Sequence, residues 1–246
     1  MQPHIRLSHG MTGAKYVLLP GDPGRVERIA TFLENPEYLG QNREFRAMRG
    51  WYQGIEILIL STGIGGPSTA IAVEELRQIG ARTLIRLGSC GALQSTLTHG
   101  DLVIVNAAVS DDGTSRTYAP AGYPACASPQ LTATLIAQAE HMAIPAVCGL
   151  IRSHDSFYTD DEDKLNTVWS ARGVLAADME TAALMVVGGL RGLRTASLLN
   201  VVVTHQGDLN SSINDFIQQE EQCRSGEARQ ISLALNAIYA DSRGGR

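Results

Sequence analysis

Short apolar segments alternate with helix-like segments along most of this sequence, and that alternation limits its fold more than any other feature. Runs rich in Val, Ile and Leu predict strands at residues 16–19, 55–60, 83–87, 102–108, 146–152 and 197–204. Helices are expected between or after them, at residues 24–32, 68–79, 130–142, 180–190 and 213–239. Such alternation is typical of an α/β domain, and strands without polar alternation are covered on both faces.

The 246 residues contain no internal repeat and no linker rich in Ser, Gly or Pro. Residues 1–246 are therefore expected to form a single domain. The last six residues, Asp241-Ser-Arg-Gly-Gly-Arg246, are expected to fray.

Composition excludes several classes of function. A formal net charge of −5 argues against nucleic acid as a partner, because that binding relies on neutralising phosphates. No apolar run is long enough to cross a membrane as a helix, and no signal peptide is recognisable. The four cysteines form no CxxC pair and the six histidines no HxxxH cluster, which predicts a cytoplasmic protein with reduced thiols.

The first predicted strand is followed by the segment Gly21-Asp-Pro-Gly-Arg25. Ligands of open α/β sheets commonly bind where strands end. Gly21 permits close approach of the backbone to an anion, and Arg25 in the first helical turn can close over it. The alternative is an ordinary tight turn with a surface arginine.

Residues 61–68, Ser-Thr-Gly-Ile-Gly-Gly-Pro-Ser, form a second glycine-rich turn. The turn lacks the complete GxGxxG pattern, and no acidic residue is well placed about 20 positions later for a cofactor ribose. It also lacks the Gly-Lys-Ser/Thr of a P-loop. NAD and ATP are therefore not expected as ligands, and Pro67 is interpreted as the start of a helix.

Two further sets of residues suit a phosphate and a sugar. Arg86 closes an apolar strand, where burying a guanidinium is costly unless an anion or a carboxylate meets it. Ser89 and nearby glycine amides would add donors, although a structural salt bridge is the alternative. Glu180 lies among small and apolar residues and suits a pair of sugar hydroxyls.

Taken together, these segments resemble the hexameric nucleoside phosphorylase family, most closely its uridine phosphorylase branch. The similarity covers nearly the whole chain, with matching motifs in order at residues 20–29, 43–45, 61–76 and 178–180. The resemblance implies a single α/β domain with a mixed, partly barrel-like central sheet flanked by helices. It also implies reversible phosphorolysis of a ribonucleoside to free base and ribose 1-phosphate.

The resemblance assigns roles to individual residues. Inorganic phosphate, the co-substrate, would be bound by Gly21, Arg25, Arg86 and Ser89, with Arg43 reaching in from a neighbouring subunit. Ribose would be held by Met179 and Glu180, with the 5′-hydroxyl capped by His4 of the neighbour.

The resemblance further implies a homo-oligomer, a hexamer built as a trimer of dimers with shared active sites. No cofactor is required. Some uridine phosphorylases hold a monovalent cation, such as K⁺, between subunits, and Glu44, Ile64 and Ser68 match that place.

The base site departs from both branches of the family. Uridine-specific members carry a Gln-x-Arg pair after Phe-Tyr, whereas this chain has Asp161-Glu-Asp163, and carboxylates cannot donate to a carbonyl. Purine-specific bacterial members place an aspartate after the late strand, where this chain has Thr204 and then His205. Uridine is the expected substrate, with a purine nucleoside as the alternative. The expected base pocket comprises Phe157, Asp161, Asp163, Val203, Thr204 and His205.

The resemblance also implies the mechanism. Phosphate attacks the anomeric carbon as the base leaves, through a transition state resembling an oxocarbenium ion and without a covalent protein intermediate. Arg86, Glu180 and His205 are the expected catalytic residues, with His205 as a proton source. The alternatives are a nucleosidase that uses water, which the three arginines argue against, and a nucleoside-binding relative without activity.

Overall fold

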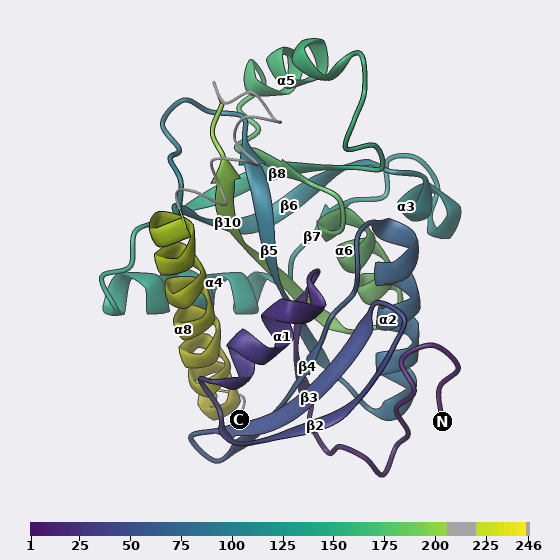
Figure 1. Ribbon diagram of the computed structural model, residues 1–246. Helices are drawn as coiled ribbons and strands as arrows, with labels where there is room; N and C mark the ends of the chain where they lie inside the picture. The colour runs from purple at the N-terminus through teal and green to yellow at the C-terminus, as the bar shows by residue number, and fades with distance from the viewer. Residues whose placement is uncertain (206–219, 245–246) are drawn as a thin grey trace.

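The computed structural model describes residues 1–205 and 220–244 of the chain. At its centre lies a mixed, ten-stranded sheet with the order β10-β6-β8-β9-β5-β1-β4-β3-β2, and β7 pairs with β6 (Figure 1). The strands are β1 (Tyr16–Pro20), β2 (Glu34–Asn42), β3 (Phe45–Tyr52), β4 (Ile55–Leu60), β5 (Thr83–Ala92), β6 (Leu102–Asp111), β7 (Ala125–Cys126), β8 (Ala146–His154), β9 (Ala176–Asp178) and β10 (Arg194–Val203). The described helices are α1 (Pro23–Ala30), α2 (Gly66–Ile79), α3 (Gly113–Tyr118), α4 (Pro129–His141), α5 (Glu162–Ser170), α6 (Thr181–Leu190) and α8 (Glu220–Gly244).

Part of the sheet closes on itself. Strand β5 pairs with β10 on one side and with β9 at its carboxyl end. Strands β10, β6, β8 and β9 also pair in that order, which completes a ring of strands. Strands β1, β4, β3 and β2 continue from β5, in that order, as an open extension. The expected single α/β domain with a mixed, partly barrel-like sheet is confirmed in its architecture.

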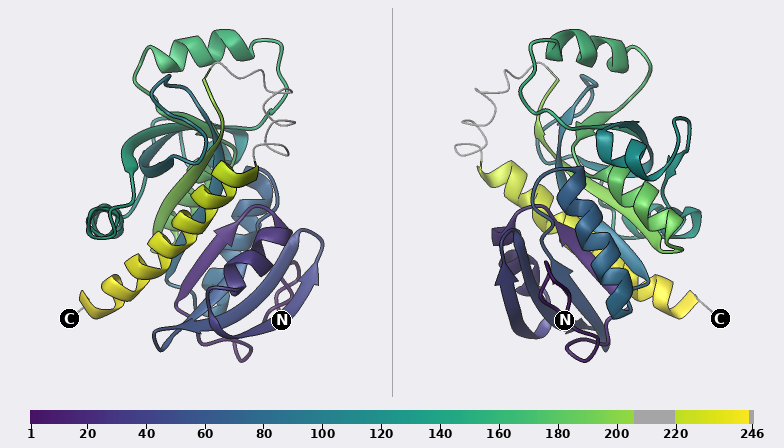
Figure 2. Two further views of the ribbon diagram at one scale, coloured as in Figure 1. Left: turned by 60° about the vertical axis from the view of Figure 1, so that its left-hand side comes forward. Right: turned by 90° about the vertical axis from the view of Figure 1, so that its right-hand side faces the viewer.

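The central strands are largely apolar because helices cover both of their faces. One face carries Leu18 and Ile85, which share a core with residues of α1, α4 and α8. The opposite face carries Val17 and Leu84, which belong to a second core with residues of α2 and α6. Figure 2 shows α8 running along one side of the sheet and α2 on the other. Neighbouring residues of a strand point to opposite faces, so a strand covered on both sides is apolar at most of its positions.

Each strand expected from the sequence is present, but several elements were not expected. The hairpin of β2 and β3 was not predicted from the sequence because β2 is largely polar and exposed. The short strands β7 and β9 and the helices α3 and α5 were also missed. Residues 213–219 of the expected last helix lie outside the described residues. The expectation of a frayed tail from Asp241 is wrong, because α8 remains helical to Gly244.

The functional turns meet at one end of the sheet. Strands β1, β4, β5 and β10 form a parallel set, so their carboxyl ends lie at a common edge. The first two turns are joined there by hydrogen bonds from Thr62 N to Pro20 O (2.9 Å) and from Gly63 N to Gly21 O (3.0 Å). In the parts of the chain that the structure describes, no helix is both long and apolar enough to cross a bilayer.

Candidate active site

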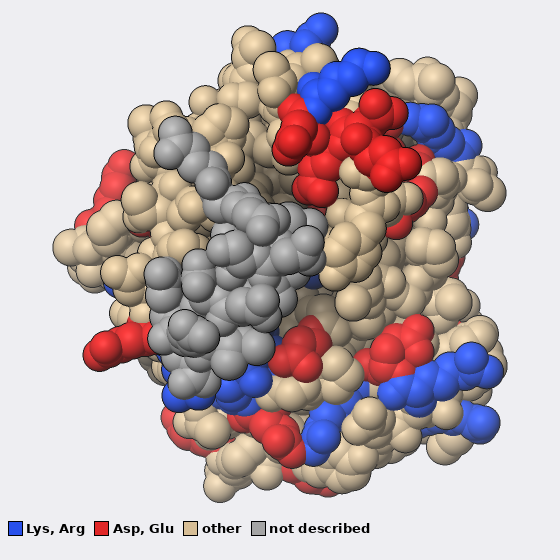
Figure 3. Space-filling model, turned by 45° about the horizontal axis from the view of Figure 1, so that its top comes forward, with Lys and Arg blue, Asp and Glu red and all other residues tan. Residues whose placement is uncertain are grey.

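A cavity of about 1170 Å³ opens at the carboxyl ends of the parallel strands. In the space-filling view it is a hollow with acidic side chains gathered on one rim (Figure 3). Most of the residues expected from the sequence line it: Gly21, Arg25, Ile64, Arg86, Ser89, Phe157, Asp163, Met179, Glu180, Val203, Thr204 and His205.

Arg86 is buried between two carboxylates. Its Nε donates to Asp178 Oδ2 (3.0 Å), and its Nη2 lies 2.6 Å from Glu180 Oε2. Although burial acts to lower the pKa of Arg86, the charges of Glu180 and Asp178 outweigh it and raise the pKa, so the guanidinium stays charged. Its Nη1 is buried and has no hydrogen-bond partner among the described residues.

Two glycines make room for this guanidinium. A Cβ at position 88 would lie 2.5 Å from Arg86 Cζ. The guanidinium can therefore lie along β5 at this point only because residue 88 is a glycine. A Cβ on Gly21 would lie 3.9 Å from Arg86 Nη1, which places the unpaired donor beside the Gly21 turn. A buried donor without a partner is unfavourable unless a ligand meets it.

Asp178 acts as the anchor of Arg86. Its carboxylate accepts hydrogen bonds from Ser153 Oγ (2.6 Å) and from both the backbone N–H (3.1 Å) and Oγ1 (2.6 Å) of Thr181. These donors tie the carboxylate to β8 and to the first turn of α6. Sequence reasoning gave Asp178 no role, because its partners come from three separate elements.

Glu180 is held in place from two sides. Its Oε1 accepts from Gly65 N (2.6 Å), while Oε2 meets Arg86. Burial raises the pKa of Glu180, although the charge of Arg86 opposes that shift. The second glycine-rich turn therefore brings a backbone amide to a carboxylate, and glycine suits its backbone because φ is positive at Gly63 (72°) and Gly65 (94°).

Arg25 is also buried, and it contacts Ser89. Its Nε donates to Glu227 Oε2 (2.7 Å), Nη1 to Leu87 O (2.9 Å) and Nη2 to Ser89 Oγ (2.9 Å). Because Ser89 Oγ accepts from Arg25, its own proton remains free to donate into the cavity. Glu227 was missed, because it lies 202 positions from Arg25 and no motif surrounds it.

Residues 15–235 match the phosphorylase superfamily. This chain belongs to that family. A guanosine phosphorylase from Halorubrum lacusprofundi is 35% identical over 97% of this chain and 98% of its own length. Uridine phosphorylase from Escherichia coli K12 is 37% identical, over 95% of both chains.

Solved structures of the superfamily agree with the fold of this phosphorylase. Uridine phosphorylase from Vibrio fischeri ES114 superposes with a TM-score of 0.91 at 43% identity, covering 97% of both chains. Purine nucleoside phosphorylase from Toxoplasma gondii, in complex with immucillin-H, gives 0.87 at 30% identity, covering 99% of this chain and 97% of its own. The predicted family, its fold and the expected enzyme class, a nucleoside phosphorylase, are confirmed.

The two residues of this phosphorylase that are expected to act in a neighbouring subunit, His4 and Arg43, do not line its own cavity. His4 Nδ1 lies 2.6 Å from Glu75 Oε1, and Asn42 Nδ2 donates to the carbonyl of His4 (2.7 Å). Arg43 follows Asn42 at the exposed tip of the β2–β3 hairpin, with a positive φ of 54°. His4 and Arg43 are therefore held near one another, and neither of them lines the cavity.

The residues expected to hold a cation come together beside this tip. Ser68 Oγ donates to the carbonyls of Ile64 (3.2 Å) and Gly65 (3.3 Å). The side chain of Glu44 packs so closely on Gly63 that a Cβ there would lie 2.6 Å from Glu44 Cγ. Among the residues that the structure describes, no three His, Cys, Asp or Glu side chains gather as a metal-binding group.

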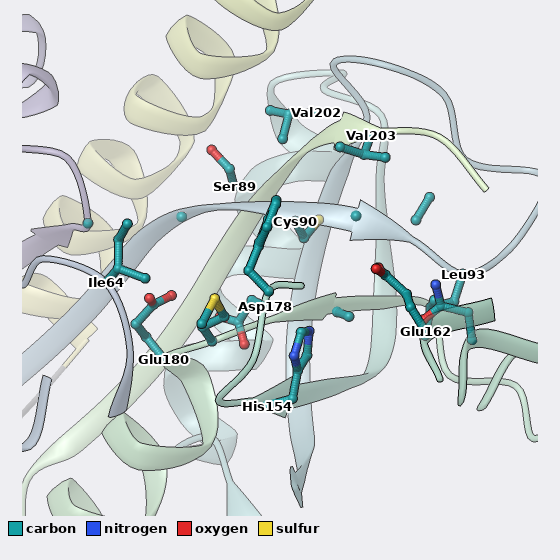
Figure 4. A pocket seen from close by; sticks show the side chains of 18 of the residues that line it. Ile64, Ser89, Cys90, Leu93, His154, Glu162, Asp178, Glu180, Val202 and Val203 are labelled. Carbon is teal, nitrogen blue, oxygen red and sulfur yellow. The ribbon is translucent and has the colours of Figure 1, made fainter. Parts of the chain in front are cut away.

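The end of the cavity expected to receive the base also includes residues to which sequence reasoning gave no role. Figure 4 shows Ile64 and Glu180 at one end and Glu162 with Leu93 at the other. Asn166 and Thr167 of α5 also line the cavity. Asp161 does not, and its Oδ1 lies 3.9 Å from Lys164 Nζ.

His154 is a further lining residue of the phosphorylase, at the end of β8. Burial, together with the charge of Arg152, lowers the pKa of His154, so its imidazole is neutral at pH 7. The strand expected at 146–152 continues to His154, and placing its end two residues later would have revealed this side chain.

Proposed function

We propose that this cytoplasmic enzyme catalyses the reversible phosphorolysis of uridine to uracil and ribose 1-phosphate. The observation that carries the proposal is the buried Nη1 of Arg86, which lacks a partner among the described residues and lies beside Gly21. Phosphate there would also meet the free proton of Ser89 and the guanidinium of Arg25. Glu180, on the other side of Arg86, would accept hydrogen bonds from the 2′- and 3′-hydroxyls of the ribose, and Met179 would pack against the sugar.

In this reaction a phosphate oxygen forms a bond to C1′ as the bond from C1′ to the base nitrogen breaks. The electron pair of the broken bond stays on the base, which is stabilised by a proton or a hydrogen bond. His205 lines the cavity and is the proposed donor. Phe157 would stack near the sugar and base, with Val203 and Thr204 completing the pocket. Arg86 and Arg25 act by positioning the anion, a contribution commonly worth about 10²- to 10³-fold in rate for a well-placed donor.

The charges around the phosphate site support a site shared between subunits. Three guanidiniums, those of Arg25, Arg28 and Arg86, already face three carboxylates, those of Asp178, Glu180 and Glu227, so these charges balance before phosphate binds. An incoming phosphate adds further negative charge, so a cation from outside this chain's cavity would strengthen its binding.

Arg43 of a neighbouring subunit is the proposed source of that cation, and His4 of the same neighbour would reach the 5′-hydroxyl. Their proximity on one exposed surface supports this arrangement. We propose a homo-oligomer, a hexamer arranged as a trimer of dimers, with K⁺ held between subunits by Glu44, Ile64 and Ser68.

Uridine is the first candidate because of one amide in the cavity. Asn166 can donate to a uracil carbonyl and accept from its N3–H, as the missing Gln of the family pattern would. Several relatives are themselves uridine phosphorylases.

Guanosine is a second candidate, because Glu162 and Asp163 line the same end of the cavity. A carboxylate accepts the paired N–H groups that guanine presents at N1 and N2, whereas uracil offers only one such donor. The relative from Halorubrum lacusprofundi is a guanosine phosphorylase.

The test is a panel of uridine, thymidine, cytidine, inosine, guanosine and adenosine, each assayed for free base with and without phosphate. Phosphate-dependent release of uracil, weakened in Asn166→Ala but not in Glu162→Gln, is the expected result. The reverse pattern with guanosine would replace uridine by the second candidate. Release of base without phosphate would identify a nucleosidase, and binding without release would identify a nucleoside-binding protein.

A further inference from the structure

Arg25 is fixed by three contacts, and one of them comes from a distant helix. A guanidinium has five N–H donors, and Arg25 gives one each from Nε, Nη1 and Nη2 to the protein. Leu87 and Ser89 belong to β5, whereas Glu227 belongs to α8. One donor remains on Nη1, beside its contact with Leu87, and one on Nη2, beside its contact with Ser89.

Glu227 uses both of its oxygens as acceptors. Oε2 accepts from Arg25 Nε and from Arg28 Nη2 (3.2 Å), and Oε1 accepts from Arg28 Nε (2.5 Å). The Glu227 side chain is 14% exposed and Arg28 is 50% exposed, so the buried partner of this carboxylate is Arg25. Burial acts to raise the pKa of Glu227, but the hydrogen bond from Arg28 and the charge of Arg25 outweigh it and lower the pKa. The carboxylate is therefore charged at neutral pH.

Gln230 of the same helix contacts β5 next to Ser89, the second residue that Arg25 shares with the proposed phosphate site. Its Nε2 donates to the carbonyls of Gly88 (2.8 Å) and Leu198 (2.6 Å), and its side chain is fully buried. Residues three positions apart share one face of a helix, so Glu227 and Gln230 act from the same face of α8. One of them holds the arginine, and the other holds the backbone next to Ser89.

We propose that Glu227 is a positioning residue for phosphate: by holding Arg25 Nε, it directs the free Nη donors of that guanidinium toward the anion. This role rests on the proposed phosphorolysis, but it concerns only phosphate binding. Glu227 contacts neither the ribose-binding carboxylate nor the expected base pocket, so its effect falls on one of the two substrates.

The same helix offers a matched control. Asp241, near the other end of α8, also uses both oxygens: Oδ1 accepts from Arg194 Nη1 (2.8 Å), and Oδ2 accepts from Arg194 Nη2 (2.6 Å) and from the Tyr16 hydroxyl (2.8 Å). Asp241→Asn therefore replaces a carboxylate of α8 that pairs with an arginine by an amide, as Glu227→Gln does, but far from the residues proposed to bind phosphate.

The experiment compares Glu227→Gln and Asp241→Asn in the full-length protein. Calorimetry gives the Kd of inorganic phosphate, kinetics give KM for each substrate, and melting gives Tm. In Glu227→Gln the negative charge is lost and one acceptor oxygen becomes an NH₂ donor that opposes the Arg28 guanidinium, so the charge-assisted contact that holds Arg25 is weakened. We expect the phosphate Kd and KM to rise about tenfold or more while the nucleoside KM changes less than about twofold. Asp241→Asn is expected to lower Tm with little change in either constant.

Equal increases in both KM values, or the same phosphate Kd in Glu227→Gln and the wild type, would overturn the positioning role. So would a loss of phosphate binding in Asp241→Asn as large as in Glu227→Gln, because the effect would then come from loosened docking of α8. Glu227→Asp serves as a second variant, expected to recover part of the phosphate affinity if charge and acceptors are what matter. If the wild type binds phosphate but releases no base, the proposed reaction fails while the phosphate Kd still tests Glu227.

Discussion

Glu180 is a buried carboxylate whose protonation decides whether it can accept hydrogen bonds from two ribose hydroxyls. Burial raises the pKa of Glu180 above its ordinary 4.5, so the protonated form persists to a higher pH than for an exposed glutamate. The ionised form is the better acceptor pair, and it is lost as pH falls through the raised pKa. We therefore expect the KM for nucleoside to rise as pH is lowered, starting above pH 4.5.

The measurement is the nucleoside KM at saturating phosphate between neutral pH and the onset of unfolding. Glu180→Gln, which cannot ionise, is expected to raise KM by about 100-fold and to remove its dependence on pH in the acid range. A nucleoside KM that stays flat in the wild type throughout this range would contradict the assigned role.

Single residues were predictable where their chemistry was unusual for their place in the chain. An arginine closing an apolar strand identified Arg86, and a carboxylate among small residues identified Glu180. Glu227 and Asp178 could not be found in this way, because charged residues on a helix or beside one are common. Their roles arise only from partners brought together by the sheet, and sequence spacing carries no record of such pairs.

At the scale of elements, α8 is fastened to the sheet near both ends by carboxylates. The prediction of a frayed tail is wrong because Asp241 pairs with Arg194 and Tyr16 instead of lying free in solvent. Strands with long apolar runs were predictable, since burial on both faces leaves a clear signal. The β2 strand and α5 were not, because β2 is mostly exposed and none of the residues of α5 is buried.

The Asp241 pair should contribute to stability in a way that depends on pH. Burial acts to raise the pKa of Asp241, but hydrogen bonds from Arg194 and Tyr16 outweigh it, and the pKa lies below its ordinary 3.8. A depressed carboxyl pKa stabilises the folded state above the unfolded-state value, and that contribution is lost as pH falls through the folded-state value. Asp241→Asn is expected to lower the free energy of unfolding at pH 7 by about 1 to 3 kcal/mol.

Urea unfolding at several pH values checks this expectation. The difference between Asp241→Asn and the wild type should be constant near neutral pH and shrink below pH 3.8, as the unfolded-state carboxylate is protonated, until the native carboxylate is protonated at its lower pKa. Glu74→Gln, which breaks the more exposed pair with Arg191, is the control and should change stability by less than about 1 kcal/mol. A difference for Asp241→Asn that is the same at every pH would assign its effect to packing instead of charge.

At the scale of the whole molecule, the closure of the sheet has no local signature. The pairing of β10 with β5 joins segments more than a hundred residues apart, and apolar runs alone fit an open sheet equally well. The partly barrel-like form was expected from family resemblance, because the order of motifs specifies a topology that strand propensity does not. For the same reason, the resemblance rather than the composition led to a site shared between subunits.

A shared site makes a definite prediction about mixed oligomers. Arg43→Gln removes a group that acts in a neighbour's cavity, whereas Arg86→Gln removes one that acts in the subunit's own cavity. Each variant alone should lose most activity. In an oligomer containing both, a cavity on the Arg43→Gln subunit keeps its own Arg86 and receives Arg43 from its neighbour. Random pairing of equal amounts leaves about one quarter of the sites intact, so co-expression should restore about a quarter of wild-type activity.

The control is co-expression of Arg25→Gln with Arg86→Gln, because both lost groups line the subunit's own cavity and no pairing restores them to one site. Native mass spectrometry establishes that mixed oligomers are present in each sample. Recovery in the Arg43 and Arg86 mixture, without recovery in the control, would require Arg43 to act across a subunit boundary. Equal inactivity of both mixtures would show that each cavity works with the residues of its own chain, and Arg43 would then have to act locally or not at all.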